Sequence, residues 1–417
     1  MNNILKLKKN RFAIILQNKI VLIDEAHEHD IENILEYELK QYKEQYNTNE
    51  NADKTSYITI MPTYDCNLKC IYCYARGGDE QKEFSLELAQ ASIRAIRKFS
   101  DASKLRIDFI GGEPFLNFSI MDYSYQFAKS KYDDVTVHIV SNGTFSSEHL
   151  KWVIDNKFSI VISHDGICHE KQRPSRNKKK TSSLIEGNIQ KLLNSNSKTI
   201  IQTIVTSYNL NYLKESIEFF LTFGLKIIKI EPVHIFESCR GSSKLIPTPQ
   251  EFVHYFIDLL KFIKEKKLNV SIYSSLLFQP NDDYYCGING QNIIVTPSGH
   301  ISACTEITRI NEPFSESIIY GHVDLEQNKI LINHNIKSKL KKLHHNYLNC
   351  LKCPLQLMCK GGCPLNVIRE SGFPPTKSKY VCAVKKLLIP SIFNLIIDDI
   401  RYADIIFQDH NIEILNH

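Results

Sequence analysis

The sequence CNLKCIYC, residues 66–73, comes directly after the apolar run YITIMP, residues 57–62, which we expect to form a β-strand. Its three cysteines have the spacing C-x3-C-x2-C and lie on one tight loop. Three such thiolates can hold three irons of a four-iron cluster and leave the fourth iron without a protein ligand. Taken alone, the motif also fits a structural zinc site whose fourth ligand lies elsewhere.

Short apolar strands alternate with helical stretches around this loop. Repeated strand–helix units predict a parallel sheet, either doubly wound or curved into a whole or partial barrel. In a barrel the loop would sit at the C-terminal mouth of the strands, where active sites are built. The predicted strands are Tyr57–Pro62, Leu105–Gly111, Thr136–Ser141, Ser159–Ser163, Ile200–Thr206 and Ile227–Glu231. The predicted helices are Leu86–Ser100, Ser147–Asn156, Ser183–Asn194 and Leu213–Phe223.

Small polar residues follow successive predicted strands. The sequences are GGEP at residues 111–114, SNGT at 141–144 and SHDG at 163–166. Glycines let the backbone come close to a ligand, and Glu113 offers a carboxylate to an ammonium group. GGEP alone also fits an ordinary turn, but polar groups at successive strand ends are how a barrel assembles one pocket.

At these residues the chain resembles the radical S-adenosylmethionine superfamily, over roughly residues 57–235. The resemblance implies that Cys66, Cys70 and Cys73 hold a four-iron cluster whose open iron chelates S-adenosylmethionine. It further implies that GGEP holds the methionyl ammonium and that SNGT and S-x-D-G line the ribose and methionine parts. Arg173 matches an arginine that meets the cofactor carboxylate. The residues assigned to the cofactor in this way are Tyr72, Gly111, Gly112, Glu113, Asn142, Ser163, Asp165 and Arg173.

Seven further cysteines resemble the SPASM domain, an auxiliary-cluster extension of peptide- and protein-modifying radical enzymes, over roughly residues 284–384. The resemblance implies that one auxiliary four-iron cluster is ligated by Cys350, Cys353, Cys359 and Cys382. The other, nearer the active site, is assigned Cys286, Cys304 and Cys363. No fourth cysteine stands in GINGQN, residues 287–292, so a non-cysteine ligand completes that cluster or the iron is open to substrate. Two zinc knuckles are the alternative. Cys168 and Cys239 belong to neither set.

The expected fold is α/β, a partial (β/α)6 TIM-like barrel followed by a small cysteine-rich iron–sulfur domain. The predicted parts are an N-terminal hairpin, helix and linker at residues 1–55, with the hairpin at 12–23 and the helix at 30–45. A radical core at 56–275, the auxiliary-cluster domain at 276–390 and a tail at 391–417 follow. After residue 275 the only regular helix expected is Lys385–Asp399.

The resemblance implies reductive cleavage of S-adenosylmethionine to a 5′-deoxyadenosyl radical, which abstracts a hydrogen from the substrate. We expect the substrate to be a ribosomally made precursor peptide that receives a thioether or carbon–carbon cross-link. The alternative is a sulfatase-type maturase that forms formylglycine in a partner protein. Three four-iron clusters and an electron donor such as flavodoxin or ferredoxin are expected. A non-catalytic zinc protein is the rival from another class.

Bulk composition restricts the other partners. A formal net charge of +5 over 417 residues is far from the basic balance of a nucleic-acid-binding protein. We find no apolar run of about 18 residues and no signal peptide, so we expect no membrane partner and a cytoplasmic location. In a reducing compartment, 12 cysteines in short regular spacings indicate metal ligands rather than disulfides.

Overall fold

The computed structural model describes residues 4–16, 19–24, 31–37, 40, 55–99, 102–234, 240–277, 286–289, 291–343, 350, 352–372, 378–407 and 411–416. The chain divides into two compact units. We call Asp53–Ile246 with Gly287–Lys342 the barrel unit, and Met1–Ala52 with Pro247–Cys286 and Leu343–His417 the composite unit. The domain boundaries expected from the sequence stay predictions.

Six parallel strands form the centre of the barrel unit and lie side by side in chain order. They are β4 (Thr55–Ile60), β5 (Lys104–Phe109), β6 (Asp134–Ser141), β7 (Ser159–Ser163), β8 (Thr199–Val205) and β9 (Ile227–Pro232). Every second residue of β8 is buried, because successive side chains of a strand point to opposite faces. The predicted parallel α/β fold is confirmed.

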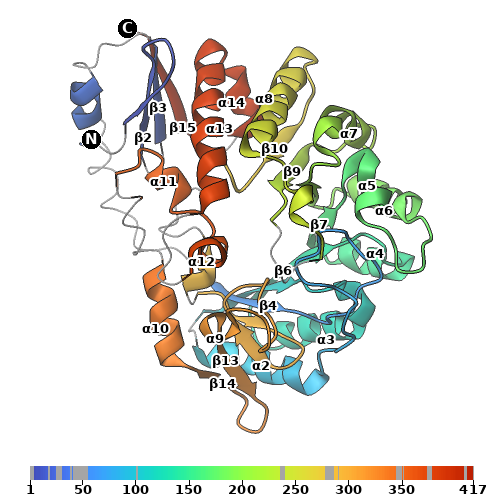
Figure 1. Ribbon diagram of the computed structural model, residues 1–417. Helices are drawn as coiled ribbons and strands as arrows, with labels where there is room; N and C mark the ends of the chain where they lie inside the picture. The colour runs from blue at the N-terminus through green and yellow to red at the C-terminus, as the bar shows by residue number, and fades with distance from the viewer. Residues whose placement is uncertain are drawn as a thin grey trace. The chain divides into compact units, whose positions relative to one another are not determined.

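Helices connect these strands and lie along their outer side (Figure 1). They are α2 (Leu86–Phe99), α3 (Phe118–Lys129), α4 (Ser147–Asp155), α5 (His169–Gln172), α6 (Ser182–Asn194) and α7 (Leu213–Leu221). α4 begins after Ser146, whose hydroxyl accepts a hydrogen bond from the His149 amide and so caps the helix. The four predicted helices are present with nearly the expected bounds, and α3 was not predicted.

The sheet of the barrel unit continues beyond β4 into the second half of the chain. β11 (Ile294–Val295) pairs with β4 in parallel. β12 (His300–Ser302), β13 (Ile319–Asp324) and β14 (Lys329–Ile332) then follow as antiparallel neighbours. The short helix α9 (Ser315–Ile318) and helix α10 (His334–Lys342) pack beside β13. Cys304 therefore lies on a loop of the same sheet that carries the first cysteine motif.

A smaller sheet organises the composite unit. β1 (Ile4–Lys6), β2 (Phe12–Ile15) and β3 (Lys19–Asp24) are antiparallel neighbours, as expected for the hairpin at 12–23, whose turn at 17–18 lies outside the described residues. β15 (Asn411–Asn416), drawn in red in Figure 1, runs parallel to the blue β3. Of the predicted helix at 30–45, residues 31–37 and 40 are described, and they are helical.

Helices α8 (Pro249–Glu265), α13 (Lys379–Asp398) and α14 (Arg401–Ile406) pack together in the composite unit. α13 begins six residues before the predicted Lys385, and it is preceded by α11 (Gln356–Cys359) and α12 (Pro364–Ser371), which were not predicted. α8 was missed despite a sequence signal, since Thr248 and Glu251 form a capping box. By length and composition alone, α13 could cross a membrane, so the absence of a membrane partner stays a prediction.

Candidate active site

The first cysteine loop is held by backbone hydrogen bonds to a distant segment. The amides of Lys69 and Ile71 donate to the carbonyls of Pro174 and Gln172 at 2.7 and 2.9 Å. Cys66 is buried, and Cys70 and Cys73 are half-buried. Burial is the main reason that the pKa of Cys66 is raised and that the pKa of Cys70 rises to about 11. The charges of Glu113, Cys70 and Cys73 raise the pKa of Cys66 further.

The glycines of GGEP fit against this loop. A Cβ on Gly112 would lie 2.0 Å from the Asp65 carbonyl oxygen, and one on Gly111 would lie 2.7 Å from that of Thr63. The amide of Glu113 donates to the Asp65 carbonyl at 2.7 Å. Both glycines are therefore required by the segment just before the cysteine loop, and the approach of GGEP to a ligand stays a prediction.

Glu113 carries a buried carboxylate next to the cysteine loop. Its oxygens accept hydrogen bonds from the Ser141 hydroxyl at 2.8 Å and from the amides of Asn142 and Phe115 at 2.7 and 3.3 Å. Burial nevertheless raises its pKa to about 7. The Asn142 side-chain nitrogen lies 3.8 Å from Cys66 Sγ, which joins the carboxylate to the thiol loop. A cationic ligand beside Glu113 would offset the cost of burying its charge.

Asp165 and Arg173 form a buried ion pair. Arg173 donates from two nitrogens to the two carboxylate oxygens of Asp165, at 3.0 and 3.1 Å. The Tyr72 hydroxyl and the Ile204 amide also donate to this carboxylate. The Arg173 guanidinium lies 5.3 Å from the ring centroid of Tyr72. Asp165 therefore orients Arg173 and Tyr72, while Ser163 is half-buried at the end of β7.

These residues fit a four-iron cluster with S-adenosylmethionine. Three thiols lie on one loop, and a buried carboxylate beside Cys66 is suited to an ammonium group. The structure thus brings Glu113 and Asn142 beside Cys66, and Asp165 and Arg173 beside Tyr72 of the same loop. Their contacts with the cofactor stay predictions.

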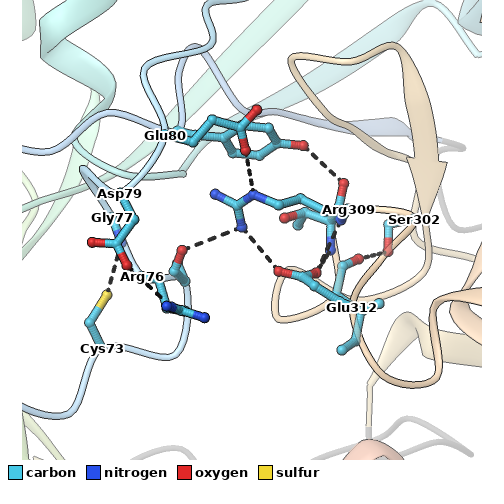
Figure 2. Close-up of polar contacts among 12 residues, drawn as sticks. Cys73, Arg76, Gly77, Asp79, Glu80, Ser302, Arg309 and Glu312 are labelled. Carbon is cyan, nitrogen blue, oxygen red and sulfur yellow. Dashed lines mark hydrogen bonds and ion pairs between the residues drawn. The ribbon is translucent and has the colours of Figure 1, made fainter. Parts of the chain in front are cut away.

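Arg309, which Figure 2 shows, and Arg240 contact the stretch after Cys73, and the sequence singled out neither of them. Arg309 pairs through Nε with Glu80 at 2.7 Å and through a terminal nitrogen with Glu312 at 3.0 Å. Its guanidinium also lies 4.0 Å from the ring centroid of Tyr64. Arg240 donates from its backbone amide to the Cys73 carbonyl at 2.9 Å and pairs with Asp79. Apart from the Arg309–Glu312 pair, these contacts join residues far apart in sequence, so no local pattern signals them.

The groups around Arg309 surround a hollow of about 390 Å³. Its lining is mostly charged, and it lies directly beside the stretch that follows the third cysteine. The lining residues are Arg76, Asp79, Glu80, Arg309, Asn311, Glu312 and Pro313.

The structure brings the second cysteine set together only in part. One pocket of the composite unit is lined by Cys350, Cys353, Cys359 and Cys382. Four thiols around one space fit the auxiliary cluster that the resemblance assigns to them. No three His, Cys, Asp or Glu side chains of the described residues are arranged to hold a single metal ion.

The remaining cysteines give less information. Cys304 belongs to the barrel unit and Cys286 and Cys363 to the composite unit, so their shared cluster stays a prediction. Cys168 is buried, and Cys239 lies outside the described residues.

Two histidines beside Asp165 are buried. The rings of His164 and His169 are stacked, with centroids 4.2 Å apart. Burial lowers the pKa of His169 to about 3 and that of His164 well below its usual value, so both rings are neutral. His164 Nδ1 accepts a hydrogen bond from the Gly166 amide at 3.1 Å, which fixes the turn beside Asp165.

Comparisons with known proteins agree with this geometry. Residues 60–220 match the radical SAM superfamily. The chain is 23% identical to the radical SAM cyclopropyl synthase TigE of Paramaledivibacter caminithermalis, over 92% of this chain and 86% of TigE. It is 27% identical to the uncharacterized protein MJ0907 of Methanocaldococcus jannaschii, over 61% of this chain and 86% of that protein.

Solved structures share the fold. Native anSMEcpe with bound AdoMet superposes with a TM-score of 0.69 at 20% identity, over 83% of this chain and 98% of that one. SuiB of Streptococcus suis bound to the precursor peptide SuiA gives a TM-score of 0.59 at 14% identity, over 86% of this chain and 82% of SuiB. The match of residues 60–220 and the three-cysteine loop beside Glu113 identify this stretch as a radical SAM domain, and the protein that carries it is an enzyme.

Proposed function

We propose that this enzyme modifies a ribosomally made precursor peptide by forming a thioether or carbon–carbon cross-link. The observation that carries the proposal is the presence of two separate cysteine sites in one chain. One has three thiols beside a buried carboxylate, and the other has four thiols. Three thiols leave an iron free for a cofactor, whereas four complete a cluster that serves another purpose.

The bound cluster and S-adenosylmethionine supply a 5′-deoxyadenosyl radical, and the side chains of this chain arrange the site around them. Cys66, Cys70 and Cys73 hold the cluster. Glu113 receives the methionyl ammonium, with its carboxylate oriented by Ser141 and by the Asn142 amide. Asp165 fixes the Arg173 guanidinium, so that a carboxylate or another anionic group meets it in one orientation.

Relatives support a peptide substrate. SuiB has been solved with the precursor peptide SuiA, and anSMEcpe with the Cp18Cys peptide. TigE, which is similar over 92% of this chain, is named a cyclopropyl synthase, and that similarity favours a carbon–carbon bond. Two auxiliary clusters, for three in total, and a small electron-transfer protein as donor complete the proposal.

The test is conversion of a peptide. The cluster-loaded enzyme is incubated anaerobically with S-adenosylmethionine, dithionite and the short precursor peptide encoded beside its gene. We expect the peptide to lose two hydrogens per cross-link, with no aldehyde detectable by a hydrazide probe. A peptide left unchanged, while the enzyme still cleaves S-adenosylmethionine, contradicts the proposal.

The second candidate is a maturase that oxidises a cysteine or serine of a partner protein to formylglycine. It is favoured by the TM-scores of 0.68 and 0.69 with the anSMEcpe structures. The same hydrazide probe separates the two candidates, because formylglycine carries an aldehyde and a cross-link does not.

A further inference from the structure

A lysine is buried in the four-cysteine pocket of the composite unit. Lys385 on α13 is only 1% exposed, although lysine side chains are almost never fully buried unless they are paired. The next residue, Lys386, lines the same pocket but is exposed to solvent. Two neighbouring lysines thus place one charge inside the pocket and one at its rim.

Local structure directs Lys385 toward the thiols. α13 begins after Ser378, whose hydroxyl accepts a hydrogen bond from the Val381 amide at 3.2 Å. Residues three apart share one face of a helix, so Cys382 and Lys385 face the same pocket. Lys385 Nζ donates to the Met358 carbonyl at 3.4 Å, and Met358 directly precedes Cys359.

The Cys359 thiol interacts electrostatically with Lys385 and with two other thiols of the pocket. Burial raises the pKa of the Cys359 thiol, the charge of Lys385 lowers it, and the charges of Cys382 and Cys353 raise it further. The same four side chains line one pocket, so the ammonium group and the three thiols share one environment.

A cation in this place favours one redox state of a cluster. Four thiolates outweigh the two positive charges of an oxidised four-iron core, and reduction adds one more negative charge. Burying negative charge is costly unless a positive charge offsets it. The potential of a cysteine-ligated cluster follows its net charge, its hydrogen bonds and its exposure. A buried ammonium therefore stabilises the reduced cluster more than the oxidised one.

We propose that Lys385 raises the reduction potential of the four-cysteine cluster by placing a buried positive charge beside it. The inference rests on the proposed function, which assigns a four-iron cluster to this pocket. It makes Lys385 a positioned charge that tunes the auxiliary cluster as an electron acceptor, without contact with the substrate.

The test is a potentiometric titration of the full-length, cluster-loaded enzyme, followed by electron paramagnetic resonance. The signal of this cluster is the one that disappears in Cys353→Ala. Lys385→Met removes the charge at similar length, Lys385→Gln keeps a hydrogen-bond donor without charge, and Lys385→Arg keeps the charge. Lys386→Met is the matched control, because it removes the same charge from an exposed position.

We expect the reduced-to-oxidised ratio at a fixed potential to fall about tenfold in Lys385→Met, which is a shift of about 59 mV for one electron. Lys385→Gln should behave alike, whereas Lys385→Arg and Lys386→Met should stay near wild type. Loss of iron in both neutral variants, with iron retained in Lys385→Arg, also supports a stabilising effect of the positive charge on the cluster.

Neutral variants with the wild-type potential overturn the inference, and so does an arginine variant that behaves like the neutral ones. A wild-type pocket that binds no cluster overturns both the inference and the auxiliary-cluster part of the proposed function.

Discussion

The two cysteine sites differ in the charge that is buried beside them. The site of Cys66, Cys70 and Cys73 has the Glu113 carboxylate. The pocket lined by Cys350, Cys353, Cys359 and Cys382 has the Lys385 ammonium group. The first pocket has three thiols, and its negative charge at Glu113 is suited to a cationic ligand. The second has four thiols, and its positive charge at Lys385 is suited to a saturated, negatively charged cluster. One charged side chain beside each set of thiols thus suits the first site to a cationic ligand and the second to a negatively charged cluster.

The largest expected effect comes from removing the three-thiol pocket. Replacing Cys66, Cys70 and Cys73 together by alanine should abolish the formation of 5′-deoxyadenosine, because these thiols are assigned to the cluster beside Glu113 that binds the cofactor. The four-cysteine cluster should still load. The product is measured by chromatography after anaerobic incubation with dithionite, and continued production by this variant would refute the assignment of the catalytic cluster.

Glu113→Gln tests the charge of the first pocket. Loss of the charged hydrogen bond to the ammonium, about 1.5–3 kcal/mol, should weaken S-adenosylmethionine binding about 10–100-fold. Binding to the cluster-loaded enzyme is measured by calorimetry without reductant. An unchanged affinity would remove Glu113 from the binding site.

The same residue predicts a pH dependence. The pKa of Glu113 is raised to about 7, so below that pH the carboxyl is protonated and cannot pair with the ammonium. Affinity should fall by up to about tenfold per pH unit below pH 7 in wild type, and Glu113→Gln should lack this dependence. The stability of the ligand-free enzyme depends on pH in the opposite direction. Burial favours the neutral carboxyl, so the contribution of Glu113 to the free energy of unfolding is lost as pH rises through about 7.

The smallest expected effect concerns the arginine contacts beside the third cysteine. Arg309→Gln removes two ion pairs and the contact with the Tyr64 ring, and we expect a loss of about 1–2 kcal/mol in the free energy of unfolding. Arg76→Gln is the control, since the Arg76–Asp79 pair is largely exposed and should contribute about 0.5 kcal/mol or less. Anaerobic urea unfolding measures both, and equal losses would contradict a special contribution of Arg309.

Sequence patterns within short stretches predicted the strands and the cysteine loop. The alternation of buried residues in strands such as β8 and the C-x3-C-x2-C spacing are both contained in short stretches, so fold class and thiol loop were recognisable. The pairing of β15 with β3 and the ion pair of Arg309 with Glu80 join residues hundreds of positions apart. Nothing in either stretch alone signals the other, so these contacts needed the structure.

Lys385 shows the same limit within a helix. In the sequence it is one of two adjacent lysines at the expected start of a terminal helix, and it has no property that separates it from Lys386. Because the helix begins at Lys379, Cys382 lies on it together with Lys385, and both line one pocket. The buried position of Lys385 is visible only in the structure. The start was recognisable from Ser378, which caps the helix.

Iron and sulfide analysis of the anaerobically reconstituted enzyme tests most directly whether the two pockets hold different clusters. Three four-iron clusters require about twelve irons per chain, of which about four should be lost in the alanine variant of Cys66, Cys70 and Cys73. Loss of a further four should follow when Cys353 is also replaced. About four irons that are unchanged by replacing Cys353, together with stoichiometric zinc that this replacement lowers, would contradict the auxiliary clusters and leave the second pocket as a zinc site.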